Sequence, residues 1–261
     1  MTVYKDLNVQ WCTEHVVLVE ICRPPTNFFD VELIEHLADV LENLEANDLC
    51  RAVVLAAQGR VFCAGADFSG GGSDLFDNNA ESNALTLYQA ALRLYRFRKP
   101  IVGAIQGPAI GGGLGLALVP DFRVVCNETR FAANFVQLGV HPGFGISLVL
   151  PRLIGQQSAN LMLLTGRRIK GEEALRFGLA DLLVDAGEVR SAAIELATEI
   201  ALCAPLAVES TRSTLRHGLA DELKSHLEHE FAEQVRLANT RDHLEGMKAV
   251  SERRAGVFHR S

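Results

Sequence analysis

Residues 99–124 read KPIVGAIQGPAIGGGLGLALVPDFRV, and this stretch decides the fold. An apolar run at 101–106 predicts a buried strand, and residues 107–110 predict a turn. The helix that follows begins among the glycines of 111–115 and runs to 118. The same order occurs twice upstream, with alternating strands and helices expected at 16–21, 31–44, 51–57 and about 81–96. Repeated strand, turn and helix units predict a layered α/β fold whose site lies in loops at one side of the strands.

Two loops of small residues are suited to presenting backbone N–H groups to a ligand. The first, Cys63-Ala-Gly-Ala-Asp67, follows an expected strand, and the second, 111–115, opens a helix about 45 residues later. Small residues let a ligand approach the backbone, and the first N–H groups of a helix point outward at the positive end of its dipole. Together the loops could bind a carbonyl oxygen that gains negative charge. For either loop alone, tight turns and helix packing are the more common use of such glycines.

Composition and charge limit the classes of partner. The chain has 261 residues, is 48% hydrophobic and carries a formal net charge of −7, which predicts a globular protein with a large core and argues against a nucleic-acid partner. Its six cysteines form no C-x-x-C pair, so we expect reduced thiols in the cytoplasm and no metal site. No stretch approaches the roughly 18 uninterrupted apolar residues of a membrane helix, so no membrane partner is expected.

The last quarter of the chain differs from the rest. Its composition becomes helical and charged, which predicts helices at 205–217, 219–237 and 243–254. We therefore expect a core with the site in residues 1–204 and a helical oligomerisation region in 205–261, whose apolar stripes pack on the core or on a second subunit. The segment 69–79, with its glycines and acidic residues, predicts a mobile loop.

Six stretches along the chain resemble one known family. They are FCAGADF (62–68), the stretch 99–124, FVQLGVHPGFG (135–145), LPRLIG (150–155), LTGRRIKGEEALRFGLAD (164–181) and TRDHLEGMKAVSERR (240–254). In order and spacing they resemble the crotonase (enoyl-CoA hydratase/isomerase) superfamily from about residue 16 to 258. The resemblance implies an α/β spiral of ββα units and a C-terminal helical region that builds a homotrimer or a dimer of trimers. It also implies an acyl-CoA thioester as substrate, and no separate cofactor, because coenzyme A enters as part of the thioester.

The resemblance assigns two catalytic residues through their backbones. The thioester carbonyl would lie between the N–H groups of Ala66, in the first loop, and Gly112, in the glycine triplet. An enolate oxyanion is the charge that such a pair of donors stabilises, and loss of one donor in comparable sites costs about 2.7–4 kcal/mol.

The acid–base groups of the family are missing from this sequence. The two glutamates with which family hydratases hold water and move protons correspond to Gly115 and Phe135, and a third carboxylate position falls on Gly143. General acid–base catalysis typically contributes about 10²–10⁴-fold, so ordinary hydration is expected to be severely weakened. Gly115 and Phe135 would also make the pocket more apolar and larger, which suits a bulky acyl group.

His141 is the first candidate to replace these carboxylates, since an unperturbed pKa of about 6.5 suits an acid or a base at neutral pH. A histidine beside a proline in a turn, however, more often bonds to nearby backbone or water. Asp67 either contacts substrate or serves as a helix cap or turn residue. Asp74, Asp77 and Glu81 are weaker candidates in or after the glycine-rich loop. The remaining substrate-binding candidates are Ala64, Phe68, Gly111, Arg23 and Phe258, with Arg253 and Arg254 as further cations for the phosphates of coenzyme A.

The function expected from the resemblance is that of a hydratase/isomerase-type enzyme that stabilises a thioester enolate. Two alternatives stay open. One is a decarboxylation or isomerisation that needs little proton transfer from the protein or uses His141. The other is a non-catalytic acyl-CoA-binding or assembly subunit.

Overall fold

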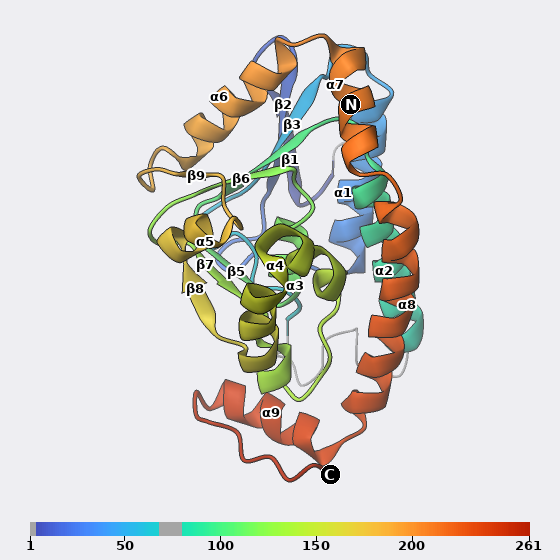
Figure 1. Ribbon diagram of the computed structural model, residues 1–261, viewed down its shortest axis with the longest axis vertical. Helices are drawn as coiled ribbons and strands as arrows, with labels where there is room; N and C mark the ends of the chain where they lie inside the picture. The colour runs from blue at the N-terminus through green and yellow to red at the C-terminus, as the bar shows by residue number, and fades with distance from the viewer. Residues whose placement is uncertain (1–3, 68–79) are drawn as a thin grey trace.

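The computed structural model describes residues 4–67 and 80–261, the side chains of 80–84 excepted (Figure 1). The glycine-rich segment 69–79 and the candidates Phe68, Asp74 and Asp77 lie outside the described residues, as does the side chain of Glu81.

A six-stranded sheet runs through the molecule in the order β1-β2-β3-β4-β6-β9. Strands β1 and β2 pair antiparallel, and all other neighbouring strands in this sheet pair parallel. The apolar run of β2 is buried along its whole length because helices cover both faces of the sheet. The strands are β1 (Leu7–Trp11), β2 (Val16–Ile21), β3 (Ala52–Ala57), β4 (Ile101–Ile105), β6 (Phe122–Val125) and β9 (Leu182–Leu183).

A second sheet of three short strands lies beside the first, in the order β5-β7-β8. These strands are β5 (Pro108–Ile110), β7 (Arg130–Ala132) and β8 (Arg168–Lys170). Successive chain segments supply one strand to each sheet and then a helix, as in β4, β5 and α3 (Gly112–Ala117). This order agrees with the expected ββα units. The turn predicted at 107–110 is wrong in part, because residues 108–110 form β5.

Helices lie on both faces of the larger sheet. The helices α1 (Val31–Glu45) and α2 (Ala80–Arg96) pack on one face, and α6 (Val189–Ala201) packs on the other. Asp30 caps α1 by accepting a hydrogen bond from the Leu33 N–H at 2.9 Å. The remaining helices before residue 205 are the 3₁₀ helix η1 (Asn134–Gln137), α4 (Ile146–Thr165) and α5 (Gly171–Phe177).

The three C-terminal helices pack against the rest of the same chain. They are α7 (Pro205–Leu215), α8 (Leu219–Ala238) and α9 (Arg241–Ser251), close to the predicted ranges. Figure 1 shows α8 running alongside α2, and Leu219, Leu223 and Leu227 of α8 belong to the main hydrophobic core. In α9, a Cβ on Gly246 would lie 2.6 Å from the Leu138 carbonyl carbon, so α9 rests directly on the chain that follows η1. Arg212 of α7 donates a hydrogen bond to Asp121 at 2.9 Å. Of the two packing surfaces expected for these helices, a second subunit or the core of the same chain, the core is therefore the one that the structure shows.

Two further sequence predictions concern the state of the cysteines and the presence of membrane-spanning helices. All six cysteines are free thiols. Within the described residues, no single helix is long and apolar enough to cross a membrane, and α6 with α7 reaches that composition only as a pair bent by 105°.

Candidate active site

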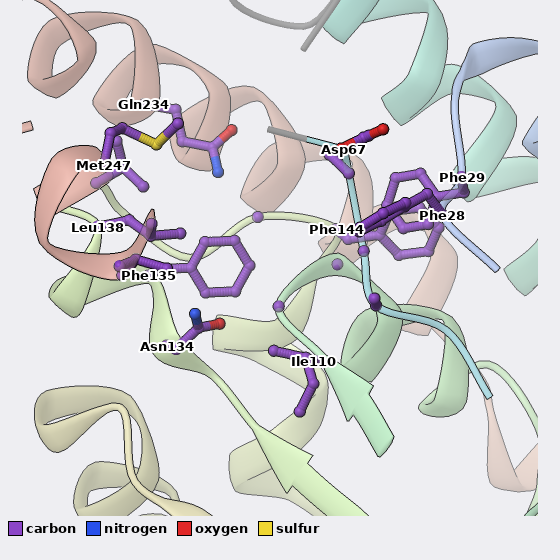
Figure 2. A pocket seen from close by; sticks show the side chains of 18 of the residues that line it. Phe28, Phe29, Asp67, Ile110, Asn134, Phe135, Leu138, Phe144, Gln234 and Met247 are labelled. Carbon is purple, nitrogen blue, oxygen red and sulfur yellow. The ribbon is translucent and has the colours of Figure 1, made fainter. Parts of the chain in front are cut away.

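A cavity of about 660 Å³ lies where the loop after β3 meets the start of α3 (Figure 2). This volume falls within the range of about 300–1,000 Å³ that is usual for small-molecule sites. Four phenylalanines and several aliphatic side chains form most of its wall. The apolar side chains are Phe28, Phe29, Leu87, Ile110, Phe135, Leu138, Val140, Phe144, Met247 and Val250.

The two glycine-bearing loops meet at this cavity. The Cys63 N–H donates to the Pro108 oxygen at 3.1 Å, and the Ile110 N–H donates to the Cys63 oxygen at 3.0 Å. Gly65 has a φ of +83°, and a Cβ there would lie 2.8 Å from the Ile110 oxygen. A Cβ on Gly113 would overlap the Cys63 carbonyl group. Glycine is therefore required on both sides of this contact, which holds the loops backbone to backbone.

The N–H groups of Ala66 and Gly112 are available at this contact. Both residues line the cavity, and a Cβ on Gly65 would lie only 3.2 Å from the Gly112 nitrogen. The neighbouring groups are used: the Gly111 N–H donates to Ala132 at 2.8 Å, and the Gly65 oxygen accepts from Phe29 at 2.9 Å. Within residues 4–67 and 80–261, no protein acceptor is in hydrogen-bond geometry with the N–H of Ala66 or Gly112. Two free donors thus face one apolar cavity.

Gly115 does not line the cavity, contrary to the prediction that it enlarges the pocket. A Cβ on Gly115 would lie 2.7 Å from the Phe144 Cβ and 2.8 Å from its Cδ1. Phe144 is 2% exposed and its ring packs on Phe29, with 5.4 Å between the ring centroids. The space that a side chain at 115 would occupy is therefore filled by Phe144.

The other two carboxylate positions do line the cavity. Phe135 contributes its ring to the wall and is 8% exposed. At Gly143, a Cβ would overlap the Tyr88 hydroxyl and lie 2.6 Å from Nε2 of Gln234. Polar side chains from α2 and α8 therefore occupy the place where a side chain of residue 143 would project.

The geometry does not support His141 as the replacement acid or base. It is absent from the cavity lining, its Nδ1 lies 2.8 Å from the Pro142 oxygen, and its ring meets that of His229 edge to face at 5.7 Å. What His141 presents toward the cavity wall is its backbone oxygen, which accepts a hydrogen bond from Gln234 at 2.9 Å. The ring instead packs against α8.

Two further substrate-binding candidates lie outside the cavity lining. The guanidinium of Arg23 is held between Asp6 at 2.8 Å and Asp30 at 2.7 Å, so its charge is already paired within the chain. Phe258 is 44% exposed and packs over Gly256 in the C-terminal tail. Arg254 pairs with Glu245 and Glu252, and Arg253 is exposed. Ala64, Asp67 and Gly111, by contrast, do line the cavity.

Several lining residues were not predicted from the sequence. Arg168, an exposed residue of β8, lines the cavity, as does Asn134 with its amide. Tyr88 lies on α2, Gln234 on α8, and Met247 with Ser251 on α9. Their spacing within amphipathic helices gives no signal beyond that of ordinary core or surface positions.

A buried carboxylate positions the loop that carries Gly143 and Phe144. Glu230 of α8 accepts hydrogen bonds from the Gly145 N–H at 2.7 Å, the Ser147 N–H at 3.0 Å and the Ser147 hydroxyl at 2.5 Å. These groups are at the N-terminus of α4, where a negative charge is favourable. Glu230 thereby ties the start of α4 to α8.

Replacing Glu230 with alanine is expected to lower the free energy of unfolding by about 3 kcal/mol, because the buried Gly145 N–H and the two half-buried Ser147 donors lose their acceptor. Urea denaturation measures the change. Glu233→Ala, one turn away and paired with exposed Arg236, is the matched control and should change stability little. Equal loss in the two variants would contradict a specific role for Glu230.

Comparison with known proteins identifies the family. Residues 12–261 match the family model described as enoyl-CoA hydratase/isomerase. The short-chain-enoyl-CoA hydratase of Clostridium acetobutylicum is 31% identical over 244 residues, covering 92% of each chain. The carnitinyl-CoA dehydratase of Proteus mirabilis is 31% identical over 258 residues, covering 92% of this chain and 93% of its own. The crystal structure of an enoyl-CoA hydratase/isomerase from Pseudoalteromonas atlantica T6c superposes with a TM-score of 0.87 and 31% identity, covering 98% of this chain and all of the other. The chain is therefore a member of the enoyl-CoA hydratase/isomerase family, the crotonase superfamily.

Proposed function

We propose that this protein binds an acyl-CoA thioester with the carbonyl oxygen at the N–H groups of Ala66 and Gly112, and that it catalyses a reaction through the thioester enolate. The observation that carries the proposal is a pair of backbone N–H groups at one apolar cavity for which residues 4–67 and 80–261 provide no acceptor. Donors that are fixed before the reaction stabilise the charge that develops on the oxygen without reorganisation. The names of the relatives, a short-chain-enoyl-CoA hydratase and a carnitinyl-CoA dehydratase, support a thioester of coenzyme A as the substrate class.

The lining of the cavity favours chemistry that moves few protons through protein side chains. Among the described lining residues, Asp67 is the one carboxylate, and it is exposed. Figure 2 shows its carboxyl group directed away from Phe135 and Gln234. We therefore propose that ordinary hydration of short enoyl-CoAs is inefficient in this protein.

Decarboxylation of a malonyl-type thioester fits this lining. Its C–C bond breaks to release carbon dioxide, and the electron pair of that bond becomes the enolate whose oxygen lies at Ala66 and Gly112. Solvent then supplies the proton at carbon. Arg168, a cation at the cavity, is placed to attract an anionic group of the thioester.

The remaining features of the proposal follow the family. We propose a homo-oligomer, a trimer or a dimer of trimers, that works in the cytoplasm without a separate cofactor. Exposed leucines on the late helices, Leu206 and Leu215 of α7 at 80% and 82% exposure, are suited to a subunit contact.

The first experiment compares binding with turnover for crotonyl-CoA. Calorimetry is expected to show saturable binding, while the absorbance of the conjugated thioester stays nearly constant and malonyl-type thioesters release carbon dioxide. Hydration at the rate of ordinary family hydratases would overturn the proposed effect of the missing glutamates. Absence of binding would overturn the acyl-CoA site itself. Binding without turnover of any thioester would favour the alternative of a non-catalytic acyl-CoA-binding subunit.

A further inference from the structure

Two hydrogen-bonded polar side chains lie among the mainly apolar residues that line the cavity. Tyr88 of α2 and Gln234 of α8 both line it, together with apolar residues that include Leu87, Leu138 and Phe144. The backbone makes room for the pair, because any side chain at Gly143 would collide with the Tyr88 hydroxyl and the Gln234 amide. The lack of a side chain at 143 is thus coupled to the presence of this pair.

Hydrogen bonds fix the orientation of the Gln234 amide. The Tyr88 hydroxyl donates to Oε1 of Gln234 at 2.5 Å, and Nε2 of Gln234 donates to the His141 oxygen at 2.9 Å. The two contacts distinguish the oxygen of the amide from its nitrogen. Figure 2 shows this amide directed into the cavity, on the side of the Phe135 ring opposite Asn134.

The fixed amide has hydrogen-bonding capacity left over. A glutamine amide carries two N–H donors and an oxygen with two lone pairs. One donor and one lone pair are used by His141 and Tyr88, and no other group among the described residues uses the rest. The amide of this lining residue therefore has one N–H donor and one lone pair left for a ligand.

The pair is neutral and cannot replace a catalytic carboxylate. Burial raises the pKa of Tyr88 well above its ordinary value, so the phenol stays protonated at neutral pH and its proton is committed to Gln234. An amide neither gains nor loses a proton under these conditions. Recognition rather than proton transfer is the chemistry open to it.

We propose that Gln234 determines specificity by binding a hydroxyl group on the acyl chain of the thioester, with Tyr88 as its positioning residue. The inference rests on the proposed acyl-CoA function and specifies its substrate class. A hydroxyl both accepts from the free N–H and donates to the free lone pair. A plain hydrocarbon chain leaves both unpaired, a carboxylate meets the lone pair with like charge, and a ketone satisfies only the donor.

The test compares thioesters that differ by one oxygen. Calorimetry with hexanoyl-CoA and its 3-, 4- and 5-hydroxy derivatives is expected to show that at least one hydroxy thioester binds the wild-type protein about tenfold more tightly than hexanoyl-CoA. Gln234→Met keeps the length of the side chain and removes its polar atoms, and should bring this ratio to one or below. Gln234→Leu, which also lacks polar side-chain atoms, should likewise remove the preference and provides a second variant if the first fails to fold.

Gln137→Met is the matched control. Gln137 is exposed, lies outside the cavity lining and donates to the Thr165 oxygen at 2.9 Å, so its replacement should leave the ratio unchanged. Equal or tighter binding of hexanoyl-CoA by the wild type would overturn the role of Gln234 while leaving the acyl-CoA site intact. A preference that survives in Gln234→Met would overturn it as well. Failure of all four thioesters to bind would overturn both this inference and the proposed function.

Discussion

Acetoacetyl-CoA bound to a Gly112→Pro variant is expected to hold about 10²–10³-fold less enolate, relative to its keto form, than when it is bound to the wild type. Proline has no N–H, so the enolate oxygen would lose one of its two proposed donors. The enolate is the charged species, and it depends on that donor far more than the neutral keto form does. Near-ultraviolet absorbance of the enolate measures its fraction directly and requires no knowledge of the natural substrate.

The Gly112→Ala variant separates loss of the donor from crowding. A Cβ at residue 112 would lie 2.8 Å from Cε1 of Phe29, so alanine and proline both displace that ring. Only proline removes the N–H. Gly112 begins α3, where proline is well tolerated. Equal enolate fractions in the alanine and proline variants would show that the N–H of Gly112 does not bind the oxyanion.

Introducing a glutamate at Gly115 is expected to destabilise the protein by about 3 kcal/mol or more. Its Cβ would meet the Cβ and ring of Phe144, and the carboxylate would be buried with no partner provided for it. Removing the ring in the same molecule, as Gly115→Glu with Phe144→Gly, should recover much of the loss. Phe144 has a φ of +62°, a left-handed conformation that glycine adopts without strain.

Urea denaturation of the wild type, both single variants and the double variant measures the coupling between the two positions. We expect Phe144→Gly alone to be destabilising, because it empties a buried site, and the double variant to be more stable than the sum of the single changes predicts. Additive changes would mean that Phe144 moves aside at little cost. Attempts to restore hydration with glutamates at 115 and 135 therefore need the Phe144→Gly background, since the parent chain has no space at 115.

The sequence was sufficient to predict three strands of the larger sheet, β2, β3 and β4, and the helices α1 and α2 on one of its faces, but not β1, β6, β9 or α6. The apolar runs of β2, β3 and β4 and the helical spacing of α1 are strong signals, because burial on a sheet face or along a helix stripe imposes a regular period. The smaller sheet was not predicted. Its strands β5, β7 and β8 have three residues each, too few for a period to show, and the proline of β5 indicates a turn.

Some residues of the candidate site were likewise predicted from the sequence and others were not. The small residues of the two loops predicted close backbone approach, and the family resemblance assigned Ala66 and Gly112 within them. Both residues line the cavity, as do Ala64 and Gly111. The prediction for Gly115 was wrong, because Phe144 fills the space beside it. Phe144 does so in a backbone conformation that phenylalanine rarely adopts, which the sequence pattern does not indicate. Tyr88 and Gln234 are 146 residues apart in the sequence, and only the packing of α8 on α2 makes them neighbours.

The residues that line the cavity are synthesised far apart in time. The two backbone N–H groups belong to residues 66 and 112, whereas Gln234 and the α9 residues Met247, Val250 and Ser251 belong to the last part of the chain. A ribosome makes the loops that carry these residues long before the helices α8 and α9, which supply the rest of the wall. Until residue 251 has been added and α9 has folded, the phenylalanine-rich wall stays open to water. A growing chain that has stalled before α8 would thus present this apolar surface to chaperones while lacking a complete cavity for the proposed ligand.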